Sequence, residues 1–184
     1  MRILSGVERG RKLKTRKGLM TRPLLSRVRK SLFDILGEAV TDGPFLDLYA
    51  GSGAVGLEAL SRGAPRADFI DKEYACIRII RENLSRCGFQ PRAKVIQEDV
   101  LNVLALLLSD EQFYLAFVGP PYYHGLQNRT LEILDCASQQ PIVIVVQHSA
   151  QEELQTDWEH IRCVRCRSYG DTCLSFFEAR EESS

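Results

Sequence analysis

The sequence predicts an α/β protein with a doubly wound, mostly parallel sheet, a C-terminal antiparallel hairpin and a basic N-terminal arm. Strand-like and helical stretches alternate from Pro44 onward, which is typical of a parallel sheet covered by helices on both faces. Near the C-terminal end, two strand-like runs instead follow each other across a turn-like tetrad at 168–171. Residues 1–30 contain eleven Lys or Arg and one acidic residue, although the whole chain has a net charge of zero.

Length and composition restrict the class of protein. A chain of 184 residues, 45% hydrophobic and 26% charged, is large enough for one domain with a substantial core. Its apolar runs are shorter than the roughly 18–20 residues that span a bilayer, and residues 1–9 lack the apolar stretch of a secretory signal. We therefore expect a cytoplasmic protein without a membrane segment, organised as a basic extension at 1–40 and a main domain at 41–184.

The first forty residues are predicted to form a hairpin and a helix. Short β-like pieces around Gly6 and Gly10 suggest a small hairpin within residues 3–15. Ser26 is a suitable residue type to cap a helix that runs to about Leu36. The apolar positions of this helix recur at spacings of three and four, at Leu25, Val28, Leu32 and Ile35, and leave Arg27 and Lys30 on other faces.

The alternating part of the chain consists of five strand-like runs and four helical stretches. The runs lie at 45–49, 67–71, 94–97, 114–118 and 141–147, and the helical stretches at 55–62, 74–87, 100–108 and 126–137. The closing hairpin is predicted from strands at 158–167 and 172–179. Ligands of doubly wound sheets bind at the carboxyl ends of the strands, so the loops after the strands form the candidate site.

The six cysteines do not predict a metal centre. Only Cys163 and Cys166 are closely spaced, and no second pair of Cys or His accompanies them as a structural zinc site requires. Both lie in a predicted strand, where an offset of three residues places two side chains on opposite faces. We expect reduced cysteines and no bound metal.

The loop after the first predicted strand has the features of a cofactor-binding turn. It runs from Asp47 to Gly56 and includes Gly51 and Gly53, which allow a tight turn and close approach of a ligand to the backbone. Asp71 ends the next strand, twenty residues after Gly51, where a carboxylate can accept hydrogen bonds from a ribose. The same spacing fits the dinucleotide fingerprint, so the glycines alone do not identify the cofactor.

Two further strand ends carry candidate residues. Asp99 follows the third strand, where it can cap the next helix, border an adenine ring, or do both. The fourth strand ends in Gly119, Pro120, Pro121, Tyr122 and Tyr123. The two prolines fix a rigid loop, and the aromatic residue after them can stack on an extruded base or simply pack within a turn.

Taken together, these motifs resemble the S-adenosylmethionine-dependent methyltransferases that modify amino groups, which have a Rossmann-like fold. The match is closer to the RsmD-type bacterial 16S rRNA guanine-N2 methyltransferases, because the N-terminal region through Leu36 and the segments 57–64 and 169–176 also look like that family. The resemblance covers nearly the whole chain.

The resemblance implies a set of cofactor-binding and catalytic residues. S-adenosylmethionine, with S-adenosylhomocysteine as its product and no metal, would bind to Asp47, Tyr49, Gly51, Gly53, Asp71, Lys72, Asp99 and Val100. The catalytic loop would be Gly119, Pro120, Pro121 and Tyr122, with Tyr122 stacked on a flipped guanine.

The resemblance also implies a partner for the basic extension. Clustered Lys and Arg neutralise phosphates, and the residues that would contact 16S rRNA are Arg9, Arg11, Lys12, Lys14, Arg22 and Arg27. The substrate would be a guanine of 16S rRNA within a small-subunit ribosomal particle, and the enzyme a monomer.

One position departs from the family pattern. The family has Asp or Asn before Pro-Pro-Tyr, where the side chain accepts a hydrogen bond from the target amino group, and this chain has Gly119. Loss of one preorganised contact of this kind costs roughly 10²–10³ in rate, so restoring Asp or Asn is expected to raise methyl transfer. A catalytically weakened or inactive RNA-binding homologue is the alternative, and an NAD-dependent oxidoreductase would leave the basic arm unexplained.

Overall fold

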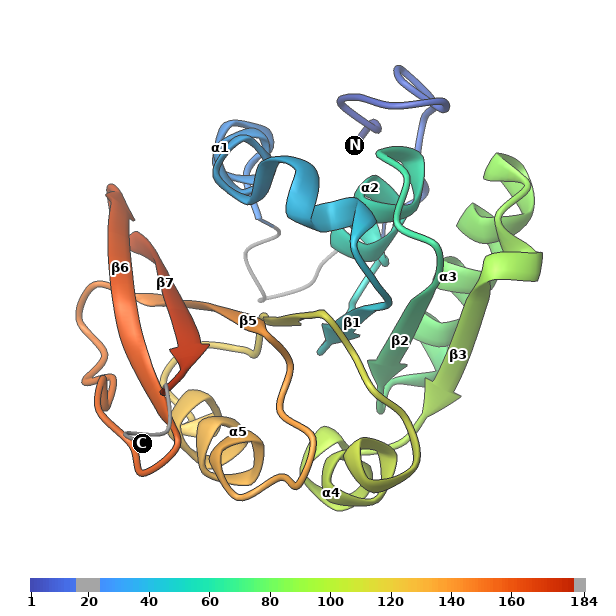
Figure 1. Ribbon diagram of the computed structural model, residues 1–184. Coiled ribbons are helices and arrows are strands. Elements are labelled where there is room, and N and C mark those ends of the chain that lie inside the picture. The colour runs from blue at the N-terminus through green and yellow to red at the C-terminus, as the bar shows by residue number, and fades with distance from the viewer. Residues whose placement is uncertain (16–23, 181–184) are drawn as a thin grey trace.

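The computed structural model describes residues 1–15 and 24–180, and a seven-stranded sheet forms its centre (Figure 1). The strands are β1 (Phe45–Leu48), β2 (Ala67–Asp71), β3 (Ala93–Gln97), β4 (Leu115–Val118), β5 (Val143–Ser149), β6 (Ile161–Tyr169) and β7 (Thr172–Ala179). Their order is β3-β2-β1-β4-β5-β7-β6. Strands β1 to β5 are parallel, and β7 pairs antiparallel with both β5 and β6. The predicted sheet and closing hairpin are confirmed.

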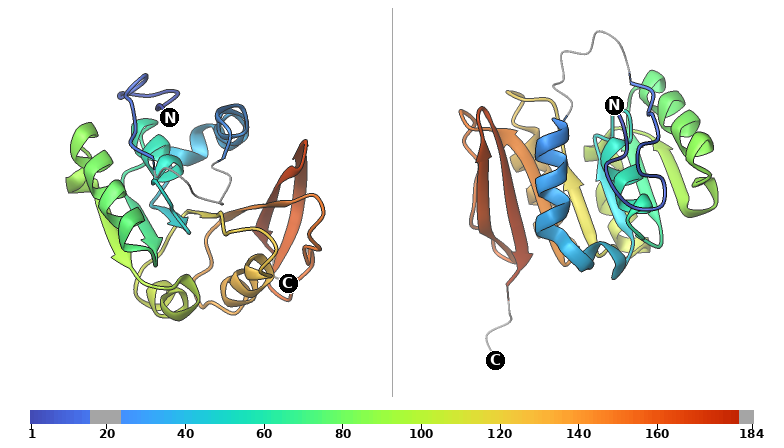
Figure 2. Two further views of the ribbon diagram at one scale, coloured as in Figure 1. Left: turned by 180° about the vertical axis from the view of Figure 1, so that it is seen from behind. Right: turned by 90° about the horizontal axis from the view of Figure 1, so that it is seen from above.

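Helices cover both faces of this sheet (Figures 1 and 2). On one face lie α1 (Ser26–Leu36), α2 (Ala54–Ser61) and α3 (Tyr74–Cys87), and on the other lie α4 (Val100–Asp110) and α5 (Leu126–Asp135). Seen from above, α1 lies between the N-terminal segment and the β6–β7 hairpin (Figure 2, right). Short 3₁₀ helices span Gly37–Thr41 and Gln90–Arg92. Within the described residues, no helix is long and apolar enough to cross a membrane.

The central strands are mostly apolar because both of their faces are buried, although β1 contains Asp47 and β2 contains Asp68 and Asp71. Every residue of β1, β2 and β4 is buried. Phe45 and Phe69 pack toward the side of α1 to α3, whereas Leu46 and Ile70 pack toward α4 and α5. The strand order reverses between β1 and β4, so the segments that follow these two strands lead away in opposite directions. The crevice between them, at the carboxyl ends of the strands, is where ligands of such sheets bind.

The buried face of α1 differs from the predicted one. Leu25 occupies the N-cap position and is 48% exposed, while Ser26 is the first helical residue and makes no capping hydrogen bond. The buried positions are Val28, Arg29, Leu32, Phe33 and Leu36. The predicted stripe is confirmed at Val28 and Leu32, and Ile35 packs partly against the core, but Leu25 is wrong because it precedes the helix, and Arg29 is an unpredicted member of the buried face.

The N-terminal residues form the predicted small hairpin. Arg2 and Lys12 make an isolated antiparallel bridge, and the Ile3 amide donates to the Arg11 carbonyl at 3.0 Å. Gly6 must be glycine, because its φ is +81° and a Cβ there would lie 1.8 Å from the Ser61 carbonyl oxygen. The hairpin thus lies directly against the end of α2.

The β6–β7 hairpin contains a bulge that changes the faces of its cysteines. Cys163 pairs with Phe177 and Cys166 pairs with Ser175, with a register shift between Cys163 and Arg165. The one extra residue reverses the alternation, so both thiols lie on the same face of the sheet. The prediction of opposite faces is wrong for this reason, and all six cysteines are free.

Candidate cofactor and substrate site

A cavity of about 520 Å³ lies at the carboxyl ends of β1, β2, β4 and β5. This volume is within the range of small-molecule sites, roughly 300–1,000 Å³. It brings together most of the residues predicted from the sequence: Asp47, Tyr49, Gly51, Asp71, Lys72, Asp99, Val100, Gly119 and Pro121. Met1, Thr15 and Leu24 also line it.

Asp47 is the most deeply buried carboxyl group of the cavity, with 1% of the residue exposed. Its Oδ2 accepts a hydrogen bond of 2.9 Å from the Gly56 amide and so fixes the start of α2 to the end of β1. Burial raises the pKa of Asp47 to about 8, with a smaller contribution from the charge of Asp71. A cationic ligand placed here would favour the ionised form of this carboxyl group.

Asp71 organises the glycine loop as well as lining the cavity. Its Oδ2 accepts from the Gly51 amide at 2.8 Å, and its Oδ1 accepts from the Glu73 amide at 2.9 Å. Each carboxylate oxygen can accept a second hydrogen bond. Asp71 therefore has the capacity to bind a ribose diol while it holds Gly51 in place. Gly53 follows in the same loop, and its amide donates to the Ala50 carbonyl at 2.8 Å.

Asp99 acts as a helix cap at the edge of the cavity. Its Oδ1 accepts from the Leu101 amide at 3.0 Å, and its Oδ2 lies 3.6 Å from the Lys72 Nζ. The capping interpretation is confirmed, and the next residue, Val100, is buried against the cavity wall. Tyr49 has a positive φ of 60°, and its hydroxyl bonds to the Thr130 hydroxyl at 2.8 Å, which anchors the loop to α5.

The loop after β4 connects the cavity to the closing hairpin. Gly119 and Pro121 line the cavity, and the Gly119 amide donates to the Leu48 carbonyl at 3.2 Å. The hydroxyl of Tyr122 contacts the Thr172 hydroxyl at 3.2 Å and accepts from the Gln147 Nε2 at 2.8 Å. Tyr122 is thereby held between β5 and β7.

Two residues of this region were not predicted from the sequence. A Cβ built on Gly119 would lie 2.7 Å from Cε1 of Phe117, a ring that is 4% exposed. Gln147 lines the cavity and is 6% exposed. The rule that strand ends carry ligand-binding residues could have identified Gln147, which ends the predicted strand at 141–147, whereas the contact of Phe117 with Gly119 depends on the position of the ring in the folded core.

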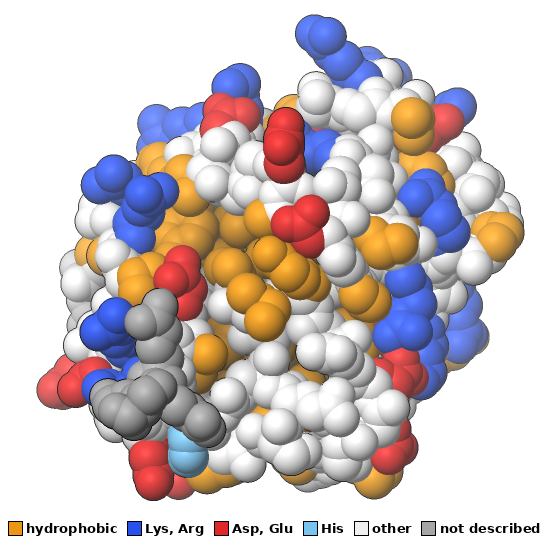
Figure 3. Space-filling model, in the orientation of Figure 1, with side chains coloured by type: hydrophobic (Ala, Val, Ile, Leu, Met, Phe, Trp, Pro, Cys, Tyr) orange, Lys and Arg blue, Asp and Glu red, His pale blue; other side chains and the backbone are white. Residues whose placement is uncertain are grey.

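The exposed basic side chains gather where the sequence predicts them. Arg9, Lys12 and Arg27 are exposed, while Arg11 pairs with Glu8 and Lys14 pairs with Glu82, both at 2.7 Å. Lys and Arg side chains form clusters over α1 and the N-terminal segment (Figure 3). An open depression of about 650 Å³ is lined by residues 7–12 and Arg86. Arg22 lies outside the described residues.

Two polar residues of α2 that were not predicted from the sequence, Glu58 and Ser61, attach the N-terminal hairpin to this helix. The buried carboxylate of Glu58 accepts from the amides of Leu4 and Ser5 at 2.8 and 3.0 Å, and lies 3.7 Å from the Arg29 Nε. The Ser61 hydroxyl donates to the Ser5 carbonyl at 2.6 Å. Arg29 is fully buried, so it contributes to the fold rather than to the exposed basic surface.

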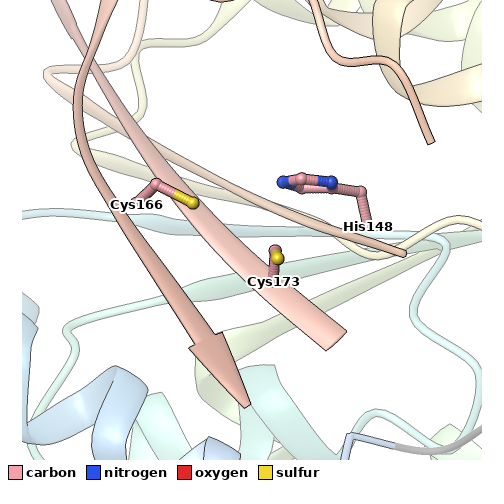
Figure 4. A group of neighbouring side chains, drawn as sticks. All are labelled: His148, Cys166 and Cys173. Atoms are coloured by element: carbon pink, nitrogen blue, oxygen red, sulfur yellow. The ribbon is translucent and has the colours of Figure 1, made fainter. Parts of the chain in front are cut away.

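A separate group of side chains lies on the opposite face of the sheet from Gln147. The group consists of His148, Cys166 and Cys173 (Figure 4). Each residue offers one atom that could bind a metal ion, and these three atoms lie within 4.8 Å of one another. The His148 Nε2 contacts the Ser175 hydroxyl and its Nδ1 the Ser149 carbonyl, both at 2.9 Å. Burial lowers the pKa of His148, so the ring is neutral at neutral pH and both nitrogens are engaged within the protein.

Comparison with known proteins places this geometry in a family. Residues 1–178 match the family model described as Conserved hypothetical protein 95. The Bacillus subtilis protein named "Putative rRNA methyltransferase YlbH" is 32% identical over 98% of this chain and 100% of its own length. Ribosomal RNA small subunit methyltransferase D of Escherichia coli is 36% identical over 73% of this chain and 67% of its own.

The solved structures agree with the sequence comparisons. A structure titled "Putative methyltransferase yhhF from Escherichia coli" covers 98% of both chains with a TM-score of 0.83 and 30% identity. The sheet order, the closing hairpin and the cavity at the strand ends therefore form a Rossmann-like methyltransferase fold. The chain belongs to the family described as Conserved hypothetical protein 95, the family of the RsmD-type rRNA methyltransferases.

Proposed function

We propose that this protein transfers a methyl group from S-adenosylmethionine to the exocyclic N2 of a guanine in 16S rRNA. The observation that carries the proposal is the cavity itself, which joins Asp47, Asp71 and Asp99 to the Gly119–Pro121 loop. The N-terminal segment, which carries exposed basic side chains, contributes Met1 and Thr15 to the cavity wall, and the relatives reported above are named as rRNA methyltransferases.

The cavity fits the chemistry of this cofactor. Its acidic residues suit a ligand that carries positive charge, and Asp71 suits the ribose hydroxyls. When bound, S-adenosylmethionine supplies an electrophilic methyl group whose bond to sulfur breaks as a bond to nitrogen forms, with the bonding pair left on sulfur. Asp47 would face the charged methionine end, and Asp99 with Val100 would border the adenine. Among residues 1–15 and 24–180, the group of potential metal ligands that lie close together is His148, Cys166 and Cys173, which does not line this cavity.

The loop after β4 would present the guanine. The Pro120 carbonyl would accept one hydrogen bond from the amino group of the guanine, and Tyr122 would stack on the base. With the cofactor bound, the N2 lone pair would face the methyl carbon, and one N2 proton would pass to water after transfer, so no strong base would be required. Orientation of the two reactants would supply much of the acceleration.

The basic segment would bind the RNA backbone. Arg9, Arg11, Lys12, Lys14 and Arg27 would contact phosphates, and we assign Arg22 the same role from its position in the sequence. The proposed substrate is a small-subunit particle in the cytoplasm, the enzyme acts as a monomer, and residues 1–40 serve as its RNA-binding extension.

The test is a methyl-transfer assay with labelled S-adenosylmethionine and either naked 16S rRNA or assembled small-subunit particles. Digestion to nucleosides and mass spectrometry should identify N2-methylguanosine at a single position. A variant with Asp71→Ala, which loses an acceptor for both Gly51 and the ribose, controls for contaminating enzymes. Label in a different nucleoside, or in none, would refute the proposal.

A second candidate function follows from Gly119. Because this residue offers no side-chain acceptor, the protein would in this case bind rRNA and cofactor but transfer methyl groups poorly or not at all. Tight binding of both ligands without measurable turnover in the same assay would favour this function.

Protonation of Asp47 gives the first prediction. Because burial raises its folded pKa to about 8, the folded state binds this proton more tightly than the unfolded state. This contribution to stability is complete below pH 4 and is lost as the pH rises through about 8. Asp47→Asn, which mimics the protonated form, should therefore stabilise the cofactor-free protein at pH 9 relative to the parent and have less effect at pH 6. The same substitution should weaken cofactor binding.

Thermal unfolding at the two pH values, together with calorimetric titration of the cofactor, measures both effects. Equal destabilisation by Asp47→Asn at pH 6 and pH 9 would contradict the assignment of a protonated carboxyl group.

The basic segment gives the second prediction. Arg9→Ala combined with Lys12→Ala should weaken binding to RNAs of different sequence to a similar extent. The slope of log affinity against log salt should become shallower by roughly 0.7–0.9 for each lost phosphate contact. The matched control is Arg165→Ala with Arg167→Ala, two exposed arginines of β6. Filter binding across a salt series measures the slopes, and equal slopes for both double variants would rule out a specific role of the N-terminal segment.

A further inference from the structure

The catalytic loop lacks a side-chain acceptor, and the structure limits what can replace Gly119. The nearest atom to a Cβ at this position would be Cε1 of Phe117, at 2.7 Å. Phe117 belongs to the buried core on the side of α1 to α3. The space that a larger side chain at position 119 would need is therefore already occupied by an aromatic ring.

Gln147 lies directly beside this position. Val118 of β4 pairs in parallel with Val146 of β5, so Gly119 and Gln147 follow on adjacent strands. Side chains of parallel partners share a face, and Gln147 lies on the same face as Val145 and Phe117. Both Gly119 and Gln147 line the cavity that holds Asp47 and Asp71.

A hydrogen-bond chain fixes the orientation of the Gln147 amide. Its Nε2 donates to the Tyr122 hydroxyl at 2.8 Å, and that hydroxyl can in turn donate to the Thr172 hydroxyl at 3.2 Å. Nε2 therefore points to Tyr122, and the carbonyl Oε1 is left for another donor. Oε1 accepts no hydrogen bond from residues 1–15 or 24–180. It is also not one of the fully buried side-chain atoms that lack a partner, so it is accessible to a ligand.

We infer that Gln147 supplies the acceptor that Gly119 lacks: its Oε1 accepts a hydrogen bond from the amino group of the target guanine. This inference rests on the proposed function. The amino group has two N–H donors, one for the Pro120 carbonyl and one for Gln147. A neutral amide accepts a hydrogen bond without adding a further carboxylate to Asp47 and Asp71, so its burial at the strand end costs less free energy than burial of a charged group. The Tyr122 hydroxyl, in this arrangement, positions Gln147.

The test compares single-turnover methyl transfer by the parent and three variants on the same small-subunit particle. Gln147→Leu removes the acceptor at similar volume, Gln147→Glu keeps an acceptor, and Tyr122→Phe removes only the hydroxyl that orients Gln147. We expect a loss of about 10²-fold or more for Gln147→Leu, the size found when one preorganised contact is removed. Gln147→Glu should stay within about tenfold of the parent, and Tyr122→Phe should lose less than Gln147→Leu.

Two further readouts separate a role in the reaction from a role in folding. Cofactor affinity and melting temperature should be nearly the same for the parent and Gln147→Leu, and Gln147→Met serves as a second apolar variant if the leucine protein does not fold. The loss should appear in the rate at saturating particle rather than in the half-saturating concentration.

The outcomes distinguish this inference from the proposed function. An active parent with an unaffected Gln147→Leu variant overturns the role of Gln147 and leaves the function in place. A larger loss in Tyr122→Phe than in Gln147→Leu also overturns it, because the Tyr122 hydroxyl would then act by itself and not by positioning Gln147. A parent that binds cofactor and does not methylate guanine N2 overturns both.

Discussion

Replacing Glu58 with Ala is expected to lower the free energy of unfolding by about 3–5 kcal/mol, the cost of removing one partner from a buried ion pair. Both side chains of the Glu58–Arg29 pair are completely inaccessible to solvent. Without Glu58, the Arg29 guanidinium keeps its contacts to the Arg2 carbonyl and the Met1 sulfur but loses the only nearby negative charge among the described ion pairs.

The substitution also removes the acceptor for three other groups. Glu58 accepts from the Leu4 and Ser5 amides and from Nε of Arg62, the last at 2.9 Å. Desolvation already lowers the pKa of Arg29, and Glu58 opposes this effect. Because folded domains are stable by about 5–15 kcal/mol in total, the loss is a large fraction of the whole, and the N-terminal hairpin should separate from α2.

Chemical denaturation of three proteins measures this effect. Glu58→Gln keeps the size and one acceptor, so it should lose less than Glu58→Ala. Glu82→Ala breaks the exposed pair with Lys14 and should cost less than about 1 kcal/mol, as surface salt bridges do. If Glu58→Ala and Glu82→Ala cost the same, the buried pair does not hold the hairpin.

Gly119→Asn is expected to lower methyl transfer about tenfold or more, although the family pattern alone predicts an increase. Any Cβ at this position meets the Phe117 ring at 2.7 Å, and overpacking of this kind typically costs 1–3 kcal/mol of stability. To relieve the contact, the ring or the loop must move, and the loop carries the Pro120 carbonyl and Tyr122. The disturbed geometry should outweigh the gain of an acceptor that Gln147 already provides.

Two matched variants separate size from polarity. Gly119→Ala adds only the clashing atom and should already lose stability, while Phe117→Leu combined with Gly119→Asn makes room and should recover part of the rate. Melting curves and single-turnover rates on the same particle give both quantities. A tenfold faster Gly119→Asn protein with Phe117 unchanged would show that the ring yields easily and that the glycine is a handicap.

The elements that depend on local pattern could be predicted from the sequence. The bounds of β2 and α3 coincide with the predicted ranges, and the other central strands and helices differ by a few residues at their ends. Periodicity is sufficient here because strands buried on both faces and helices packed on a sheet leave strong apolar patterns. The cavity residues Asp71 and Asp99 follow from the same reasoning, since Asp71 ends β2 and Asp99 follows β3, whereas Asp47 lies within β1 and is assigned through the family resemblance.

The remaining features depend on contacts between distant parts of the chain. Arg29 reads as one more basic residue of the arm until Glu58 is placed against it. The extra residue of the β6 bulge leaves no apolar signature, yet it decides which face carries Cys166. The Phe117 ring explains Gly119 only through its packing, and Gln147 acquires a role only when β4 and β5 are side by side.

Asn83 of α3 joins the two halves of the site through one side chain. Its Oδ1 accepts from the Lys14 amide at 2.8 Å, and its Nδ2 donates to the Lys14 and Ser52 carbonyls, both at 3.0 Å. Lys14 belongs to the basic segment, and Ser52 lies between the two glycines of the cofactor loop. A ligand that fixes the backbone at Lys14 should therefore also restrain the backbone at Ser52, and the reverse. Coupling of this kind between two binding sites is reciprocal at equilibrium. Under the proposed function, we therefore expect the affinity for RNA and the affinity for cofactor to depend on each other, so each should be measured at a stated occupancy of the other site.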